Sequence, residues 1–156
     1  MARGQVIIVT ETPRVQPART DLSLEEYVAM GAPALVDLYP GASDEEMCRH
    51  EDRLLPYLLI QDDGVLFERY PTLTGAFAWA ANWKNREDFG DITIAGPDVI
   101  SLTICNNDED NQWEIRDAET GALLASGRLC GGDPPTFEEY RRALDLAKKK
   151  KEERDD

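Results

Sequence analysis

Lysine is nearly absent from most of this chain: only Lys84 occurs before residue 148, and the other four lysines form the run 148–151. Residues 1–147 hold eleven arginines and Lys84 against 27 acidic residues, a net charge of −15, and the whole chain carries −14. A negative field of this size repels nucleic acid and anionic lipid and attracts cationic protein surfaces. The composition therefore favours a basic protein surface as the partner, with no direct nucleic-acid or membrane binding.

Histidine and cysteine are also scarce. His50 is the single histidine, so a zinc site built on histidines is excluded. Cys48, Cys105 and Cys130 are odd in number and irregularly spaced, which argues against a disulfide framework and favours buried structural thiols in a reducing compartment. The sequence has no nucleophile elbow, phosphate-binding glycine loop or dinucleotide fingerprint. We therefore assign no catalytic residue, cofactor or metal.

Long hydrophobic runs are missing as well. The apolar run Val6–Val9 is too short for a signal peptide, and no stretch of 18 apolar residues is present. Together with the free cysteines, this pattern predicts a soluble, cytoplasmic protein.

Three segments carry a capping box, in which a Ser or Thr hydroxyl precedes a Glu by three residues. They start at Ser23, Ser43 and Thr136, and the extra acidic residue in each first turn suits the positive end of the helix dipole. Gly31 and Pro56 end the first two helices. A further segment is rich in alanine and aromatic residues. The predicted helices span residues 24–31, 44–55, 75–83 and 137–152.

Strands are predicted between these helices. Val6–Val9 is β-branched and continuously apolar, as in a strand buried on both faces, and a short strand is expected between helices 24–31 and 44–55. Asp62-Asp63-Gly64 separates two apolar runs, 57–61 and 65–70, and predicts a hairpin turn. This turn explains the paired aspartates without a catalytic role.

From Asp91 onward the pattern is that of an antiparallel meander. Its predicted strands contain Ile92 and Ile94, then residues 100–104, 113–115 and 122–129. The last two strands are joined by the turn Asp117–Gly121, in which Gly121 is expected at positive φ.

The order of elements predicts an α+β fold, because a parallel sheet would need a helix between most strands. We expect a single globular domain over residues 1–156. Its largely antiparallel sheet consists of the C-terminal four-strand meander plus a hairpin, with about four helices packed mainly on one face. Residues 11–21 are predicted to form an extended connector, and residues 148–156 the charged end of the last helix.

The densest polar stretch is Asn106–Asn111, between two predicted strands. A calcium loop counted from Asp108 would place Trp113 at the position that requires glycine, so a solvated hairpin loop is favoured over a metal site. As a row of six exposed polar residues, the stretch could present a negative recognition tip. Its candidate contacts are Asp108, Glu109 and Asp110.

Two tryptophans, Trp79 and Trp83, are predicted to lie on one face of helix 75–83, four residues apart. Core packing is the favoured interpretation, because large aromatic side chains dominate core burial. The alternative is a partner surface, since Trp83 is followed by the cations Lys84 and Arg86, and such mixtures are typical of binding hot spots.

The lysine run does not indicate nucleic-acid binding. Four acidic residues within 152–156 nearly neutralise it, and cations are favoured at a helix C-terminus in any case. A compositional explanation competes with every partner hypothesis. Low lysine, high arginine and excess acid are also typical of a GC-rich genome or a salt-loving cytoplasm.

The leading hypothesis is a small acidic, non-enzymatic binding protein or inhibitor. It would engage a basic, nucleic-acid-binding protein by charge mimicry, as anti-defence inhibitors do. The alternatives are an immunity protein or antitoxin that neutralises a basic toxin, an enzyme with carboxylates at the meander, and a structural or assembly subunit. A contiguous acidic face favours mimicry, whereas a pocket with several carboxylates favours an enzyme. The sequence carries no signal for an oligomeric state. The candidate partner contacts are Asp108, Glu109, Asp110, Glu45, Glu46, Glu138 and Trp83.

Overall fold

The computed structural model describes residues 21–155. The predicted strand Val6–Val9 and all but the last residue of the predicted connector 11–21 lie outside the described residues. Contacts group the chain into two compact units that divide between Arg53 and Leu54, and each is described by itself. The single domain over residues 1–156 stays a prediction.

The described part of the first unit, from residue 21 on, contains three short helices. They are α1 (Leu24–Ala29), α2 (Leu35–Leu38) and α3 (Asp44–Leu54), whose last residue falls beyond the boundary. Both predicted capping boxes in this unit are confirmed. Ser23 and Ser43 each accept a hydrogen bond on Oγ from the N–H of the Glu three residues later, at 3.1 Å, and each Glu carboxylate accepts from the serine N–H at 2.9 Å.

The predicted short strand before α3 is wrong, because the chain forms α2 there. Leu35 and Leu38 are both buried, and a spacing of three residues places them on one side of a helical turn. In a strand, the same spacing would turn them to opposite faces.

Polar and aromatic contacts tie the first unit together. The Tyr27 hydroxyl donates to the Pro33 carbonyl at 2.6 Å, and the Tyr39 ring stacks on His50 with ring centroids 3.6 Å apart. The Arg53 Nε donates to the Leu22 carbonyl at 2.8 Å. Among residues 21–53 few large apolar side chains are buried, so these contacts contribute to the local order.

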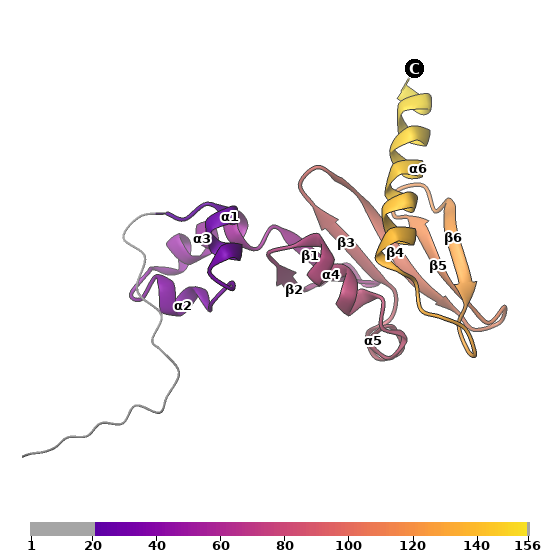
Figure 1. The fold of residues 1–156 in the computed structure, drawn as a ribbon, viewed down its shortest axis with the longest axis horizontal. Helices are drawn as coiled ribbons and strands as arrows, with labels where there is room; N and C mark the ends of the chain where they lie inside the picture. Colours follow the sequence, from indigo (N-terminus) through magenta and orange to yellow (C-terminus); the bar gives the residue numbers. More distant parts are fainter. Residues whose placement is uncertain (1–20, 156) are drawn as a thin grey trace, which may run out of the picture. The chain divides into compact units, whose positions relative to one another are not determined.

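The second unit is built on one six-stranded sheet, in the order β2-β1-β3-β4-β5-β6, with every neighbouring pair antiparallel (Figure 1). The predicted hairpin and the predicted C-terminal meander are both confirmed, and β1 joins them by pairing with β3. Gly121 has a φ of 78°, as expected for its turn. The strands are β1 (Tyr57–Gln61), β2 (Leu66–Tyr70), β3 (Ile92–Gly96), β4 (Val99–Asn107), β5 (Gln112–Asp117) and β6 (Leu123–Arg128).

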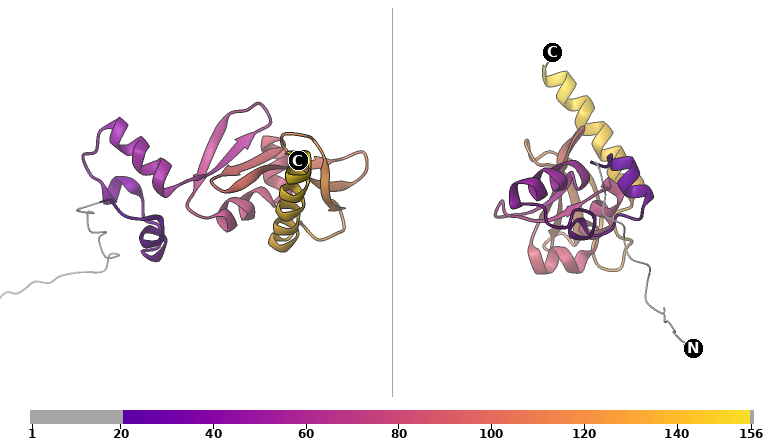
Figure 2. Two further views of the ribbon diagram at one scale, coloured as in Figure 1. Left: turned by 90° about the horizontal axis from the view of Figure 1, so that it is seen from above. Right: turned by 90° about the vertical axis from the view of Figure 1, so that its left-hand side faces the viewer.

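Helices of this unit pack on one face of the sheet, as predicted. Figure 2 shows α4 (Leu73–Ala80) and α6 (Phe137–Asp155) on the same side of the strands. Because side chains alternate along a strand, every second residue of the meander points into this layer. The core combines the helix residues Ala76, Phe77, Ala80, Tyr140, Ala143 and Ala147 with the strand residues Leu59, Ile92, Ile94, Leu102, Ile104, Trp113 and Ile115.

The predicted helix 75–83 is two helices. Thr72 caps α4 through a hydrogen bond from the Gly75 N–H, and a new cap at Asn82 starts α5 (Trp83–Phe89). The expectation that Trp79 and Trp83 share one helical face is therefore wrong. Trp79 is partly buried and packs against the core, whereas Trp83 is 52% exposed.

Candidate functional site

A buried arginine fixes the position of α5. The helix begins at Trp83, because Asn82 Oδ1 accepts from the Lys84 N–H at 2.9 Å. One turn later, Arg86 points inward and is only 3% exposed. Its Nη1 donates to the Ala80 carbonyl at 2.8 Å, and its Nε donates to Asn106 Oδ1 at 2.7 Å. Arg86 thus ties α5 to the end of α4 and to the end of β4.

The loop of residues 129–135, which joins β6 to α6, lies across from α5. The Trp113 Nε1 donates to the Asp133 carbonyl at 3.0 Å, and Asn111 Oδ1 accepts from the Cys130 N–H at 2.9 Å. A Cβ at Gly127 would overlap the Trp113 indole, so glycine lets the ring lie against β6. These contacts from β5 and its preceding turn hold the loop in place.

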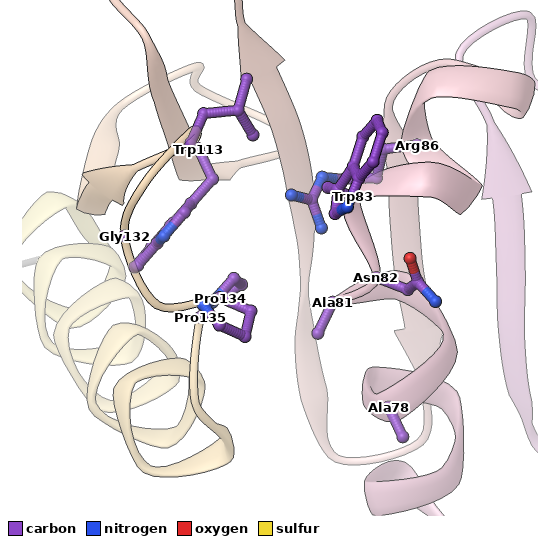
Figure 3. Close-up of a pocket in the computed structure, with 10 residues that line it drawn as sticks. Ala78, Ala81, Asn82, Trp83, Arg86, Trp113, Gly132, Pro134 and Pro135 are labelled. Carbon is purple, nitrogen blue, oxygen red and sulfur yellow. The ribbon is translucent and has the colours of Figure 1, made fainter.

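A groove of two adjoining pockets separates α5 from this loop. Figure 3 shows the residues that line the smaller pocket. The pockets measure about 330 Å³ and about 590 Å³ and share four residues. In Figure 3, Trp83 and Arg86 lie on the α5 side of the smaller pocket, and Pro134 and Pro135 lie on the other side. We call the two pockets together the α5 groove. Its shared residues are Trp83, Arg86, Leu129 and Gly132.

The two halves of the α5 groove differ in chemistry. The smaller half is apolar, with walls from the alanine-rich end of α4, the Trp113 ring and the two prolines. The larger half is acidic, because Glu87, Asp91 and Asp108 line it. We define the acidic rim as these three residues with Glu109 and Asp110, which are exposed in the same turn as Asp108.

Burial shifts the pKa values of three groups in and near the groove, namely Arg86, Asp91 and Cys105. It lowers the pKa of Arg86 to about 10, so the guanidinium stays charged at neutral pH. It also raises the pKa of Asp91, although hydrogen bonds from the Cys105 thiol and the Asn106 N–H oppose that rise. Burial and the nearby Asp91 raise the pKa of Cys105 to about 12. Cys105 is therefore a neutral thiol, not an activated nucleophile.

Two of the predicted contact residues, Trp83 and Asp108, line the same pocket. Glu109 and Asp110 share the β4–β5 turn with Asp108, and Asn107 fixes that turn by donating from Nδ2 to Asp110 Oδ2 at 3.1 Å.

The other three predicted contacts are not in the α5 groove. Glu138 lies exposed in the first turn of α6, with its carboxylate 3.7 Å from Arg142. Glu45 and Glu46 belong to α3 of the first unit. Glu46 serves as the capping-box acid there, and Glu45 lies 3.7 Å from Arg49.

Two sequence expectations about exposure are wrong. The stretch Asn106–Asn111 is not exposed throughout, because its three asparagines are partly buried and hydrogen-bonded. The cysteines are not all buried either: Cys48 and Cys130 are exposed and Cys105 is partly buried, all three as free thiols.

The sequence favours core packing for Trp83, and this prediction is wrong because the side chain is exposed. The alternative treated Lys84 and Arg86 as surface cations beside it. Arg86 is instead buried, and Lys84 is paired with Glu87 at 3.3 Å and with Asp88 at 3.5 Å.

Sequence reasoning missed Arg86 and Asn106 as partners, together with loop 129–135. One signal was present: an Asn follows the alanine-rich segment directly before Trp83, which is a helix cap in the middle of the predicted helix. The pairing of Arg86 with Asn106 across 20 residues has no counterpart in local spacing.

Within residues 21–155, no group of three or more His, Cys, Asp or Glu side chains is arranged to hold a metal ion. No helix in the described part of the chain is both long enough and apolar enough to cross a membrane. Comparison with protein-family models, with curated proteins and with solved structures finds no match to this chain.

Proposed function

We propose that this protein is a non-enzymatic binding protein that engages a basic protein surface through the α5 groove and its acidic rim. The observation that carries the proposal is the position of an exposed tryptophan at a pocket lined by carboxylates. Trp83 is 52% exposed, and Glu87, Asp91 and Asp108 line the same pocket.

This combination suits a cationic side chain. The face of an indole attracts an ammonium or guanidinium group, and the attraction grows as the pair loses water. Carboxylates around the ring add Coulombic attraction and steer a cationic partner toward the groove. Tryptophan is also enriched among the residues that dominate interface energy.

The partner that we propose is a nucleic-acid-binding protein, because such proteins present basic grooves. Carboxylates on the acidic rim would stand in for phosphates and compete with nucleic acid, which is the mode of an anti-defence inhibitor. An immunity protein or antitoxin that covers a basic toxin would use the same chemistry. We also propose a cytoplasmic location, supported by the three free thiols.

Site-specific photo-crosslinking tests the proposal. A photoreactive phenylalanine analogue replaces Trp83 in one variant and, as the control, Glu152 near the exposed end of α6 in another. We expect crosslinks at position 83, and not at position 152, to a protein with a basic surface. The proposal fails if no crosslink is specific to position 83, or if the recovered protein is acidic.

One observation favours a second candidate function, an enzyme with carboxylate acid–base groups. The same pocket holds three carboxylates, and burial raises the pKa of Asp91 above its usual value. A metabolite panel distinguishes the two candidates. A small molecule that raises the Tm of the wild type, but not of Asp91→Asn, favours the enzyme.

A further inference from the structure

We propose that the α5 groove binds an extended segment of its partner in which an apolar side chain and an Arg or Lys lie two residues apart. This inference rests on the proposed function and specifies the chemistry of the partner. Three features of the groove support this inference: its division into two halves, the position of Trp83, and the unused hydrogen-bond donor of Arg86.

The two halves select different side chains. The smaller half is walled by Ala78, Ala81 and Trp113 on the sheet and helix side and by Pro134 and Pro135 on the loop side. A cavity of about 330 Å³ with such walls suits an aliphatic or aromatic side chain.

The larger half, with its three carboxylates, suits a cation. Trp83 belongs to the walls of both halves, so its side chain borders both the apolar site and the cationic site. An arginine or lysine in the larger half would lie against the indole and face Glu87 and Asp108.

Arg86 supplies a donor for the backbone of the segment. Its Nε and Nη1 are occupied by Asn106 and Ala80, and within residues 21–155 its Nη2 has no hydrogen-bond acceptor. The side chain is 97% buried and lines both halves of the groove. Nη2 itself is partly accessible to solvent, so an acceptor on a ligand can reach it.

The acceptor that fits is a neutral carbonyl oxygen. A phosphate or carboxylate would also accept from Nη2, but it would lie beside Glu87, Asp91 and Asp108 and be repelled by them. A peptide carbonyl accepts the hydrogen bond without adding negative charge. The groove therefore fits a peptide backbone better than it fits a free anion.

The spacing follows from the geometry of an extended chain. Because the two halves share a wall, the side chains that fill them must come from nearby positions. In an extended segment, residues i and i+2 point to the same side, about 6.6 Å apart. Residue i+1 then points away, and the carbonyl groups between the two anchors run past Arg86.

The test measures binding of short labelled peptides to the full chain by fluorescence anisotropy. The main probe is acetyl-Gly-Leu-Gly-Arg-Gly-amide. The matched controls replace its Leu by Gly, replace its Arg by Glu, or place Leu and Arg next to each other. We expect each control to bind about tenfold more weakly or worse. Trp83→Ala should weaken the main probe about tenfold.

Arg86→Ala could unfold the protein, so Trp83→Ala, at an exposed position, is the decisive variant. Arg86→Lys is the second test variant, because lysine keeps the charge but cannot donate hydrogen bonds to three acceptors in one plane. It should weaken the main probe while leaving the circular dichroism spectrum unchanged.

The outcomes separate this inference from the proposed function. If all arginine peptides bind equally, and Trp83→Ala has no effect, the segment inference is overturned while binding of basic partners stands. If inorganic phosphate displaces the probe at millimolar concentration, Arg86 binds an anion, and the inference is also overturned. If no arginine peptide binds, the inference and the proposed function both fail.

Discussion

The guanidinium of Arg86 donates from Nε to the side-chain oxygen of Asn106 across 2.7 Å, and this bond ties α5 to the end of β4. Both residues line the acidic half of the α5 groove. The Nη1 of the same arginine donates a hydrogen bond to the Ala80 carbonyl at 2.8 Å. One buried cation therefore sets the position of the helix that carries Trp83.

Removing this cation should destabilise the second unit. Arg86→Ala leaves the Asn106 and Ala80 oxygens without a donor, so we expect a loss of about 3 kcal/mol in the free energy of unfolding. Urea denaturation measures it. Arg141→Ala, at an exposed position of α6, is the matched control and should change stability by less than about 0.5 kcal/mol. Equal losses in the two variants would contradict the structural role of Arg86.

Gly121 should be required by the β5–β6 turn. Its φ is 78°, and a Cβ there would meet no other atom within 4 Å, so any loss on substitution comes from backbone strain. Gly121→Val should destabilise the fold by on the order of 1–3 kcal/mol. Gly121→Asn is the control and should lose less, because asparagine tolerates the left-handed region. An unchanged denaturation midpoint for the valine variant would show that the turn does not hold residue 121 at positive φ.

The partly buried carboxyl of Asp91 should make stability depend on pH. Its pKa is raised by burial, so folding favours the protonated form. The resulting contribution to stability is present below the pKa of the unfolded chain, about 3.9, and is lost as the pH rises through the higher pKa of the folded state.

The variant Asp91→Asn removes this ionisation. It should raise the Tm over the wild type at neutral pH, and the gain should vanish below about pH 3.5. Thermal unfolding across this range measures the effect, with Asp145→Asn, at an exposed position of α6, as the control. A gain that is the same at every pH would show that the ionisation of Asp91 is not its cause.

The protein should not bind duplex DNA or RNA. Its net charge is −14, and the one run of cations, Lys148–Lys151, is followed by acidic residues at the end of α6. Too few clustered cations are present to release counterions from a duplex. A mobility-shift assay at about 150 mM salt checks this expectation, and a Kd in the micromolar range or tighter would contradict it.

Local signals in the sequence are enough to predict most of the helices and strands of the fold. The capping boxes at Ser23, Ser43 and Thr136 placed three helix starts, and the Asp-Gly turn at Gly64 placed the hairpin. These signals worked because each depends on neighbours within a few residues. The failure at α2 has a different origin, because this helix depends on burying Leu35 and Leu38, which no local pattern specifies.

The α5 groove could be predicted only in part. The acidic turn at Asp108 and the exposed-tryptophan alternative at Trp83 were visible in the sequence, but their meeting in one pocket was not. That meeting depends on contacts between distant segments. Arg86 reaches Asn106, and Trp113 reaches Asp133, each across 20 residues. Composition gives the sign of the charge, whereas these long-range contacts decide where it is concentrated.

The proposed function requires that the acidic rim steers a basic partner into the α5 groove. The most direct test changes Asp108→Asn, Glu109→Ser and Asp110→Asn together and measures association with the partner recovered by crosslinking at position 83. The matched control neutralises three exposed acids at the end of α6, namely Glu152, Glu153 and Asp155.

We expect the rim variant to keep its stability within about 0.5 kcal/mol, to associate more slowly, and to show a flatter dependence on salt. The control variant should associate like the wild type. If the rim variant stays folded and its association rate and salt dependence are unchanged, the acidic rim is not the recognition element.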